Sequence, residues 1–386
     1  MKRFFITTFF AVLIGLFSYD VGYAEEALEV VEEAPAIEEV QDEEPLSAPE
    51  SIEEEEALTS IKQPVWERIA GATALKTMQK VVRTDNVFPV LDDPGAFLCT
   101  ESNYKDALAC AGLAGFQNAC ILITNKDKLS PETKAEIKRL GIHWVVIVGG
   151  ESAVSTTVEK QVSKIFSVRY VSRIAGKTAV GTANALFHSN NVANWDRTVV
   201  VVTGDGYKDA LSIAPFAYWA HAPMFLTRSS KDSSKRILPP NAIEDIKQLA
   251  ARRQGRNGVD KVVIIGGLSA VSSKVEKQLD EIGVTHIRLA GKNAIETSEY
   301  CAWFSLSEGM NMKHLTVATT KSYKDALCAV PICGQLGSVM VLCNPKGGLS
   351  AFDHIYSVTS VEHGHVIGGE SAISAENFDY IARNMF

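Results

Sequence analysis

Apolar residues follow two alternating patterns along the chain. The strand-like runs of the first part are AFLCT (96–100), ACILIT (119–124) and WVVIVGG (144–150). These runs are apolar almost throughout, which is typical of parallel strands covered on both faces. The segments with helical spacing of apolar residues are 104–116, 130–141 and 155–165. Short strands that alternate with helices predict right-handed β-α-β units in three layers.

The helical segment 130–141 carries signals at both of its ends. Ser130 is expected at the N-cap, followed by Pro131 as the first helical residue. Gly141 is expected to end the helix. These signals place a helix between two of the predicted strands.

The same short motifs occur three times. They are YKDAL at 104–108, 207–211 and 323–327, R-[IL]-A-G at 68–71, 173–176 and 288–291, and G-G-x-S-A-[VI]-S at 149–155, 266–272 and 368–374. Their common order indicates an internal triplication. Tyr104 lies 45 residues before Gly149, whereas the middle copy needs 59, which predicts a longer surface connection and helix there. We expect three tandem Rossmann-like or flavodoxin-like α/β units with parallel sheets.

The first 64 residues differ from the rest. Residues 1–24 combine a basic start, a short apolar run and small residues before Ala24, which predicts a secretory signal peptide; a buried N-terminal helix is the alternative. Residues 25–64 are rich in Glu and Pro, so we expect an acidic disordered linker. The expected repeats are 65–172, 173–287 and 288–386. No later run is long and apolar enough for a membrane span, so we expect a secreted protein without membrane insertion after signal cleavage.

The charge is distributed unevenly. The whole chain has 38 Lys and Arg against 46 Asp and Glu, a net charge of −8. Residues 1–60 hold 16 of the acids and 2 of the bases, which leaves 36 bases and 30 acids, a net charge of about +6, for residues 61–386. A mildly basic folded part suits an anionic partner. Solubility combined with an acidic spacer is the alternative interpretation.

Few residues suggest catalysis or a cofactor. GKT at 176–178 lacks the first glycine of a phosphate-binding loop, and GDG at 204–206 lacks the third glycine of a dinucleotide site. His363 and His365 have no apparent third metal ligand, so we interpret them as surface histidines. The seven cysteines have no CxxC spacing, and we interpret them as small buried residues rather than a disulfide framework. We therefore predict no catalytic residue, no metal and no cofactor.

Three sets of repeated residues are candidates for binding. The YKDAL helix is expected at the carboxyl end of a strand, where open α/β sheets bind ligands, although its Asp also suits simple capping and packing. The Gly-Gly pairs either hold an anion or only permit a tight turn. The arginines either grip anionic groups or join units through backbone carbonyls or the Asp side chains. The candidates are Arg68, Arg173, Arg288, Asp106, Asp209, Asp325, Lys105, Lys208, Lys324, Gly149, Gly150, Gly266, Gly267, Gly368 and Gly369.

Together these motifs resemble the cell wall-binding repeat 2 family of Gram-positive surface proteins, which includes clostridial cell wall proteins. The resemblance covers residues 65–386 and adds a short apolar strand in each copy (CILI, PMFL, VMVL). It implies a pseudo-threefold body of three repeats. It also implies non-covalent anchoring to an anionic secondary cell wall polymer at the cell surface.

The chain departs from the family pattern at two places. An Arg-Tyr pair is common after R-x-x-G, but this chain has Ala74-Leu75, Ala179-Val180 and Ala294-Ile295. The nearby threonines are kept: Thr77, Thr182 and Thr297. Of the family's Pro-Ile-Leu-Leu strand, only Pro223 keeps the proline. These departures bear on polymer affinity more than on the fold.

The function expected from the sequence is a secreted wall-binding protein that is not an enzyme. Its expected partner is an anionic wall polymer, with other surface proteins as possible partners and no nucleic acid. An α/β enzyme that acts on wall glycans and a structural surface-layer component are the alternatives. Triplication favours binding, because three weak sites on a repetitive polymer give avidity.

Overall fold

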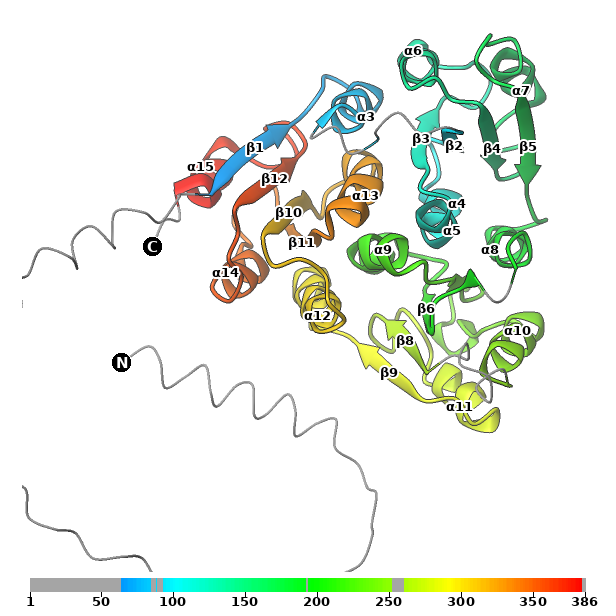
Figure 1. Ribbon diagram of the computed structural model, residues 1–386. Helices are drawn as coiled ribbons and strands as arrows, with labels where there is room; N and C mark the ends of the chain where they lie inside the picture. Colours follow the sequence, from blue (N-terminus) through cyan, green and yellow to red (C-terminus); the bar gives the residue numbers. More distant parts are fainter. Residues whose placement is uncertain (1–63, 85–87, 89–92, 192–193, 252–259, 384–386) are drawn as a thin grey trace, which may run out of the picture. The chain divides into compact units, whose positions relative to one another are not determined.

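Three four-stranded parallel sheets form the scaffold of the computed structural model, which describes residues 64–84, 88, 93–191, 194–251 and 260–383 (Figure 1). In sheet order the strands are β3 (Cys120–Thr124), β2 (Gly95–Thr100), β4 (Trp144–Val148) and β5 (Tyr170–Ile174); β7 (Met224–Leu226), β6 (Thr198–Val202), β8 (Lys261–Ile265) and β9 (His286–Leu289); and β11 (Val339–Cys343), β10 (His314–Thr319), β12 (His363–Ile367) and β1 (Val65–Ile69). The order is the same in each sheet. The predicted α/β class with three parallel-sheet units is therefore confirmed.

The third sheet is completed by the first strand of the described chain. β1 pairs in parallel with β12, and Arg68 lies opposite Val366. In the same way β5 pairs with β4, and β9 pairs with β8. Each R-[IL]-A-G strand thus joins the sheet of another repeat. No sheet is built from one sequence copy alone. The repeat boundaries therefore stay a prediction; they are 65–172, 173–287 and 288–386.

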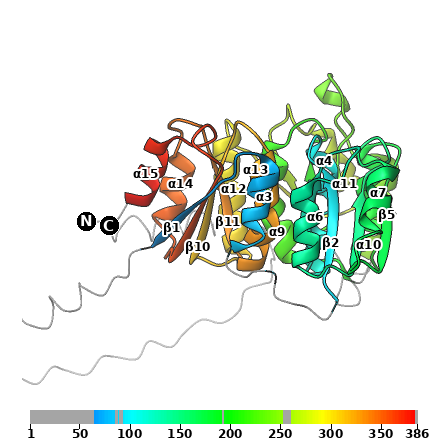
Figure 2. The ribbon, with the colours of Figure 1, turned by 90° about the horizontal axis from the view of Figure 1, so that it is seen from above.

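Helices cover both faces of the sheets, so most strands are buried. The inner strands β2 and β6 contain no exposed residue, as their apolar runs predict, and neither do β3, β7 and β11 at one edge of each sheet. At the opposite edge, β1 and β5 alternate between exposed and half-buried residues over most of their length. In Figures 1 and 2, α14 and α15 lie on one side of the third sheet and α13 lies on the other.

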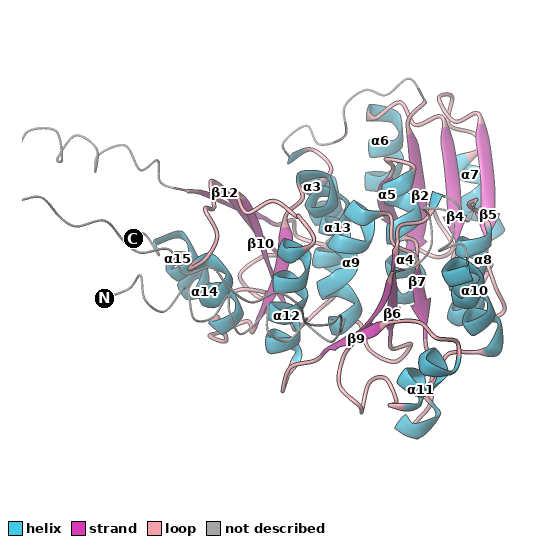
Figure 3. Ribbon diagram, turned by 60° about the horizontal axis from the view of Figure 1, so that its bottom comes forward, coloured by secondary structure: helices cyan, strands magenta, loops and turns pink. Residues whose placement is uncertain are grey.

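The helices between and after the strands are shown in cyan in Figure 3. They are α3 (Ala74–Val81), α4 (Tyr104–Ala109), α5 (Ala111–Phe116), α6 (Pro131–Arg139), α7 (Thr156–Val162), α8 (Ala179–His188), α9 (Lys208–Ala220), α10 (Pro240–Ala251), α11 (Lys274–Glu281), α12 (Ala294–Ser307), α13 (Lys324–Leu336), α14 (Ser350–Tyr356) and α15 (Ala375–Arg383), with a short 3-10 helix η3 (Ser233–Lys235). Among the described residues, none of these helices has the length and apolarity that a membrane crossing requires.

One local expectation is corrected, and the N-cap position of Ser130 is confirmed without a side-chain cap bond. The segment 104–116 was expected to form one helix, but it divides at Cys110 into α4 and α5. Its glycines lower helix propensity, which fits this break. Ser130 does precede Pro131 at the start of α6, but its hydroxyl caps no helical amide. Instead it accepts hydrogen bonds from the backbone and side-chain amides of Asn125.

The YKDAL helices of the three copies pack against one another at the centre. α5 contacts α9 and α13, and α9 also contacts α13 (Figure 1). Tyr218 on α9 is 2% exposed, and its hydroxyl donates to the carbonyl of Ala119 at 3.1 Å. The Gln335 amide donates to the same hydroxyl at 3.0 Å. One side chain of the middle copy thus contacts both other copies, in agreement with a pseudo-threefold body.

Candidate functional site

The three repeated arginines hold the Gly-Gly turns. Each Nη1 donates to the carbonyl of the first glycine: Arg68 to Gly368 at 3.0 Å, Arg173 to Gly149 at 2.8 Å and Arg288 to Gly266 at 2.7 Å. Each arginine thereby fixes the turn at the end of the strand with which its own strand pairs. The sequence analysis left backbone carbonyls open as partners of the arginines but did not identify the Gly-Gly turns among them.

Further contacts engage each guanidinium group, although Arg288 Nη2 is buried without a hydrogen-bond partner among the described residues. Arg173 Nη2 lies 2.7 Å from Glu159 Oε2, and Arg288 Nε lies 2.8 Å from Glu276 Oε1. Arg68 donates to two more backbone carbonyls and lies over the ring of Phe378. These contacts fit the interpretation that the arginines join segments through carbonyls. The partner acids are glutamates of the following helices, not the YKDAL aspartates.

The YKDAL aspartates lie against the Gly-Gly turns. A Cβ added at Gly149 would lie 2.4 Å from Asp106 Oδ2, and one added at Gly266 would lie 2.4 Å from Asp209 Oδ2. Burial raises the pKa of Asp106 and of Asp209. In the third copy, Asp325 is farther from the turn, at 3.4 Å from a Cβ added at Gly368. This placement fits capping and packing better than direct contact with a ligand.

Only the first glycine of each pair needs to be glycine. Gly149, Gly266 and Gly368 have φ of 100°, 102° and 112°, a region that side chains rarely adopt. The second glycines, Gly150, Gly267 and Gly369, have no such φ, and a Cβ there would meet nothing closer than 4.0 Å. Turn geometry therefore accounts for the first position, and the second remains open to a ligand.

Alanine substitutions test this difference. We expect Gly149→Ala to lower the free energy of unfolding by about 1–3 kcal/mol, because it forces a side chain into a strained φ and against Asp106. Gly150→Ala is the matched control and should change it by about 0.5 kcal/mol or less. Urea denaturation of the two variants provides the measurement. Equal stability of both would contradict the assignment.

The threonines that this chain keeps have one shared role. Thr77, Thr182 and Thr297 accept a hydrogen bond from the amide of the R-[IL]-A-G glycine, at 3.0, 3.1 and 3.0 Å. Each hydroxyl thus links the first turn of a helix to the R-[IL]-A-G segment before it.

Sequence reasoning missed the role of the first letter of YKDAL. Tyr104, Tyr207 and Tyr323 meet edge to face, with ring centroids 5.3–5.7 Å apart. The Tyr207 hydroxyl donates to the carbonyl of Thr320 at 2.7 Å, and the Tyr323 hydroxyl donates to that of Glu101 at 3.2 Å. Each of these bonds crosses to the next copy. The threefold recurrence of the tyrosine was the available signal.

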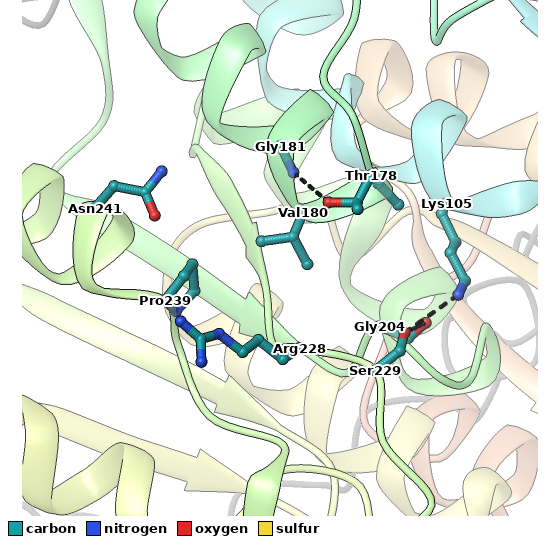
Figure 4. A pocket seen from close by; sticks show the side chains of 10 residues that line it. Lys105, Thr178, Val180, Gly181, Gly204, Arg228, Ser229, Pro239 and Asn241 are labelled. Carbon is teal, nitrogen blue, oxygen red and sulfur yellow. Dashed lines mark hydrogen bonds between the residues drawn. The ribbon is translucent and has the colours of Figure 1, made fainter.

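Lys105 contributes to a pocket between the first and middle copies (Figure 4). The pocket has a volume of about 590 Å³ and is lined by Lys105, Thr178, Ala179, Val180, Gly181, Gly204, Arg228, Ser229, Pro239 and Asn241. Lys105 Nζ lies 3.4 Å from Ser229 Oγ. In the view of Figure 4, Val180 lies between Lys105 and Arg228. Lys208 and Lys324 hold the equivalent positions in the other copies and do not line this pocket.

The pocket depends on the longer connection of the middle copy. The segment 227–239 joins β7 to α10, whereas only 125–130 joins β3 to α6. This connection supplies Arg228 and Pro239 to the wall. Its length was predicted from the spacing of the motifs, but the residues that it brings to the pocket were not.

Cysteine and histidine chemistry gives no second site. All seven cysteines are buried and free, as expected, and burial raises the pKa of Cys120 and of Cys333 to about 12. Within the described ranges, no three His, Cys, Asp or Glu side chains are placed to hold a metal ion. His363 is exposed, but His365 is 4% exposed, so its assignment to the surface was wrong. β12 is an inner strand covered on both faces, which explains the burial of His365.

Three kinds of comparison place the chain among known proteins. The family described as Cell wall binding domain 2 (CWB2) matches residues 68–159, 173–276 and 288–377. N-acetylmuramoyl-L-alanine amidase LytC of Bacillus subtilis (strain 168) is 26% identical over 278 residues, which are 71% of this chain and 50% of that protein. The Amidase enhancer of the same organism is 26% identical over 318 residues, 81% of this chain and 39% of that protein.

Two solved structures share the fold. Cwp6 from Clostridium difficile has a TM-score of 0.70 at 22% identity, over 83% of this chain and 48% of that one. Cwp8 from the same organism has a TM-score of 0.68 at 25% identity, over 86% of this chain and 55% of that one. The chain thus spans about half the length, or less, of these relatives. Because three matched segments cover most of its length, the chain belongs to the Cell wall binding domain 2 family and is a protein associated with the cell wall.

Proposed function

We propose that this chain is a non-catalytic binding protein, held at the cell surface by an anionic wall polymer. The polymer contacts the loops at the carboxyl ends of the three sheets. One observation carries this proposal: most basic side chains of these loops make no salt bridge in the described part of the chain. Lys235 and Arg236 are the exceptions, paired with Asp232 and Asp205. Within that part, the basic loop residues without a salt bridge are Lys105, Lys126, Lys128, Lys177, Lys208, Arg228, Lys231, Lys292, Lys321, Lys324 and Lys346.

Acids on the same loops are fewer. Glu101, Asp127, Glu151 and Glu370 follow the strand ends. Asp205 is already paired with Arg236 at 3.1 Å, and Asp232 with Lys235 at 3.7 Å. Cations without an acidic partner keep their full charge for a ligand. A loop surface of one dominant sign raises the local concentration of a polymer of opposite sign.

The amino ends of the strands differ. Lys261 is bound to Glu308 at 2.5 Å, Lys313 to Glu362 at 2.6 Å, and Arg197 to Asp260 at 2.5 Å. These three cations are therefore largely neutralised by their partners. The contrast between the two ends favours the carboxyl-end loops as the polymer-binding surface.

The pocket chemistry supports binding rather than catalysis. Its ten lining residues include no carboxylate, histidine or cysteine, so no general base faces a nucleophile there. Basic loops of all three copies can contact successive units of a polymer and add to the binding, even where one cluster binds most strongly. The amidase activity in the name of one relative belongs to a protein of which this chain spans half.

Export to the wall completes the proposal. Residues 1–24, proposed as a signal peptide, and residues 25–64, proposed as an acidic linker, lie outside the described residues. Export would bring the three repeats to the wall side of the membrane. A structural surface-layer role is the alternative, and no feature of the sheets or loops favours it.

Salt dependence of wall binding tests this function. We expect protein bound to isolated cell walls at low ionic strength to be largely released at roughly 0.5 M NaCl, where the screening length is only about 4 Å. The reason is that exposed lysines bind the polymer mainly by charge. Co-sedimentation across a salt series measures the effect. Binding that salt leaves unchanged would contradict the electrostatic part of the proposal.

Charge reversals at the two ends of the sheets test which end binds the wall polymer. Lys208→Glu changes an exposed, unpaired side chain at the carboxyl end and should weaken sedimentation with walls. Lys313→Glu changes a paired side chain at the amino end and should leave sedimentation nearly unchanged. The reverse ranking would move the binding surface to the opposite end of the sheets.

A further inference from the structure

The loops at the carboxyl ends of the three sheets share a fold but differ in the charged residues and the open space that they provide. We propose that the pocket between Lys105 and Arg228 is a single dominant anion site on this chain, rather than one of three equivalent sites. Its ligand is a phosphate or carboxylate group carried on a sugar or polyol. The inference rests on the proposed wall-polymer binding. It specifies where on the chain the polymer binds and at how many strong sites.

Strand register identifies the equivalent positions. The equivalent residues of the middle, third and first copies are Met224, Met340 and Ile121, which pair with matching residues of the neighbouring strands. Four residues later these copies have Arg228, Asn344 and Asn125, and three residues before the YKDAL tyrosine they have Gly204, Thr320 and Glu101. Of these three equivalent places, in that order, only the first combines an arginine with a glycine.

The chain itself fills the second place. The Asn344 amide oxygen accepts from Thr320 Oγ1 at 2.9 Å, and Asn377 Nδ2 donates to the Asn344 carbonyl at 3.0 Å. Ile295, the equivalent of Val180, lies so close to Gly348 that an added Cβ would be 2.9 Å from its Cδ1. This packing occupies the room that the pocket offers beside Val180.

The third place carries a negative charge. Glu101 stands where the pocket has Gly204, and its carboxylate opposes an anionic ligand. The amide of Asn125 is directed to the hydroxyl of Ser130 at 2.9 Å rather than to an open space. Lys324 and Lys126 remain nearby, so this place keeps some attraction for anions but has no arginine.

The pocket joins the groups that an anionic sugar requires. Arg228 is exposed and offers a planar fork that matches a carboxylate or phosphate, and Lys105 adds a second cation. Ser229, Thr178 and Asn241 add hydroxyl and amide groups for sugar hydroxyls. Val180 and Pro239 provide apolar surface for the ring face. The small residues Ala179 and Val180 leave this volume open.

Titration calorimetry with short defined probes tests the proposal. The probes are hexamers of galacturonate and of glycerol phosphate, with neutral maltohexaose as reference. We expect at least one anionic hexamer to bind with a stoichiometry near one per chain, and maltohexaose not to bind. The two anionic arms distinguish a carboxylate from a phosphodiester. A stoichiometry near three, or no binding of either hexamer at about 1 mM, would overturn the single site.

Substitutions at two exposed positions test whether the probe binds in the pocket. Arg228→Asn installs the residue of the other two copies and should weaken probe binding at least tenfold. Lys231→Asn removes a charge from the same connection but outside the pocket, and should weaken it less than threefold. Both variants should keep the wild-type thermal midpoint. Equal effects of the two would overturn the assignment to the pocket.

Wall sedimentation of the same variants separates this inference from the proposed function. If wild-type protein sediments with walls but Arg228→Asn binds the probe as well as wild type does, the single site is wrong and wall binding stands. If wild-type protein does not sediment with walls although it binds a probe at one site, the proposed function fails and the pocket stands.

Discussion

The Tyr218→Ala variant is expected to lower the free energy of unfolding by about 3–5 kcal/mol, the range for removal of a large buried aromatic ring. Tyr218 is 2% exposed and contacts the helices of both other copies. The helices around Tyr218 are already in close contact with it, so they cannot move in to fill the cavity. A Cβ added at Gly334 would lie 2.2 Å from the Tyr218 ring, and one added at Gly115 would lie 1.8 Å from the Tyr218 carbonyl oxygen. Chemical denaturation measures the loss.

Two further variants show how much of that loss in stability comes from the hydroxyl and how much from burial of the ring. Tyr218→Phe removes only the hydroxyl that bonds Ala119 and Gln335, and should cost about 1–2 kcal/mol. Tyr300→Ala, at a tyrosine that is 40% exposed, is the control and should cost about 0.5 kcal/mol or less. If Tyr218→Ala were no worse than Tyr300→Ala, the three copies would not share a core at this position.

The second large effect is expected at the arginines. Arg288→Ala should lower the free energy of unfolding by about 2–3 kcal/mol, because the buried carbonyls of Gly266 and Val271 lose their donor. The Arg288 side chain is only 15% exposed, so water cannot readily replace it. Arg288→Lys should recover little, since an ammonium group cannot reproduce the fork.

An exposed arginine supplies the control for this effect. Arg197 pairs with Asp260 at the surface, and the two side chains are 55% and 42% exposed. Arg197→Ala should therefore cost about 0.5 kcal/mol or less. If Arg288→Ala kept full stability while wall binding fell sharply, the arginines would be ligand-binding residues rather than joints between segments.

The sequence predicted the class of the fold because its signals are local. Continuous apolar runs indicated buried parallel strands, and the repeated motifs indicated three units. The exchange of edge strands could not be predicted, because an apolar pattern identifies a strand but not its partner. β1 has the same motif as β5 and β9, yet it pairs across nearly the whole chain with β12.

The candidate site was predicted less completely. The sequence pattern placed Gly149 and Asp106 at strand ends, and the structure adds Arg173 to them. The sequence pattern left their role open, because bonding to a carbonyl and gripping an anion require the same guanidinium group. Arg228 was missed because the equivalent positions of the other copies hold Asn125 and Asn344, so the repeated motifs give no signal there. Its place beside Lys105 depends on the path of that loop, which residue spacing does not define.

Sedimentation with purified cell walls, before and after chemical removal of the anionic polymer, tests the central claim most directly. We expect the protein to co-sediment with intact walls at low salt and at least nine-tenths of this binding to disappear on stripped walls. Equal binding to intact and stripped walls, or no binding to intact walls, would contradict anchoring through an anionic wall polymer.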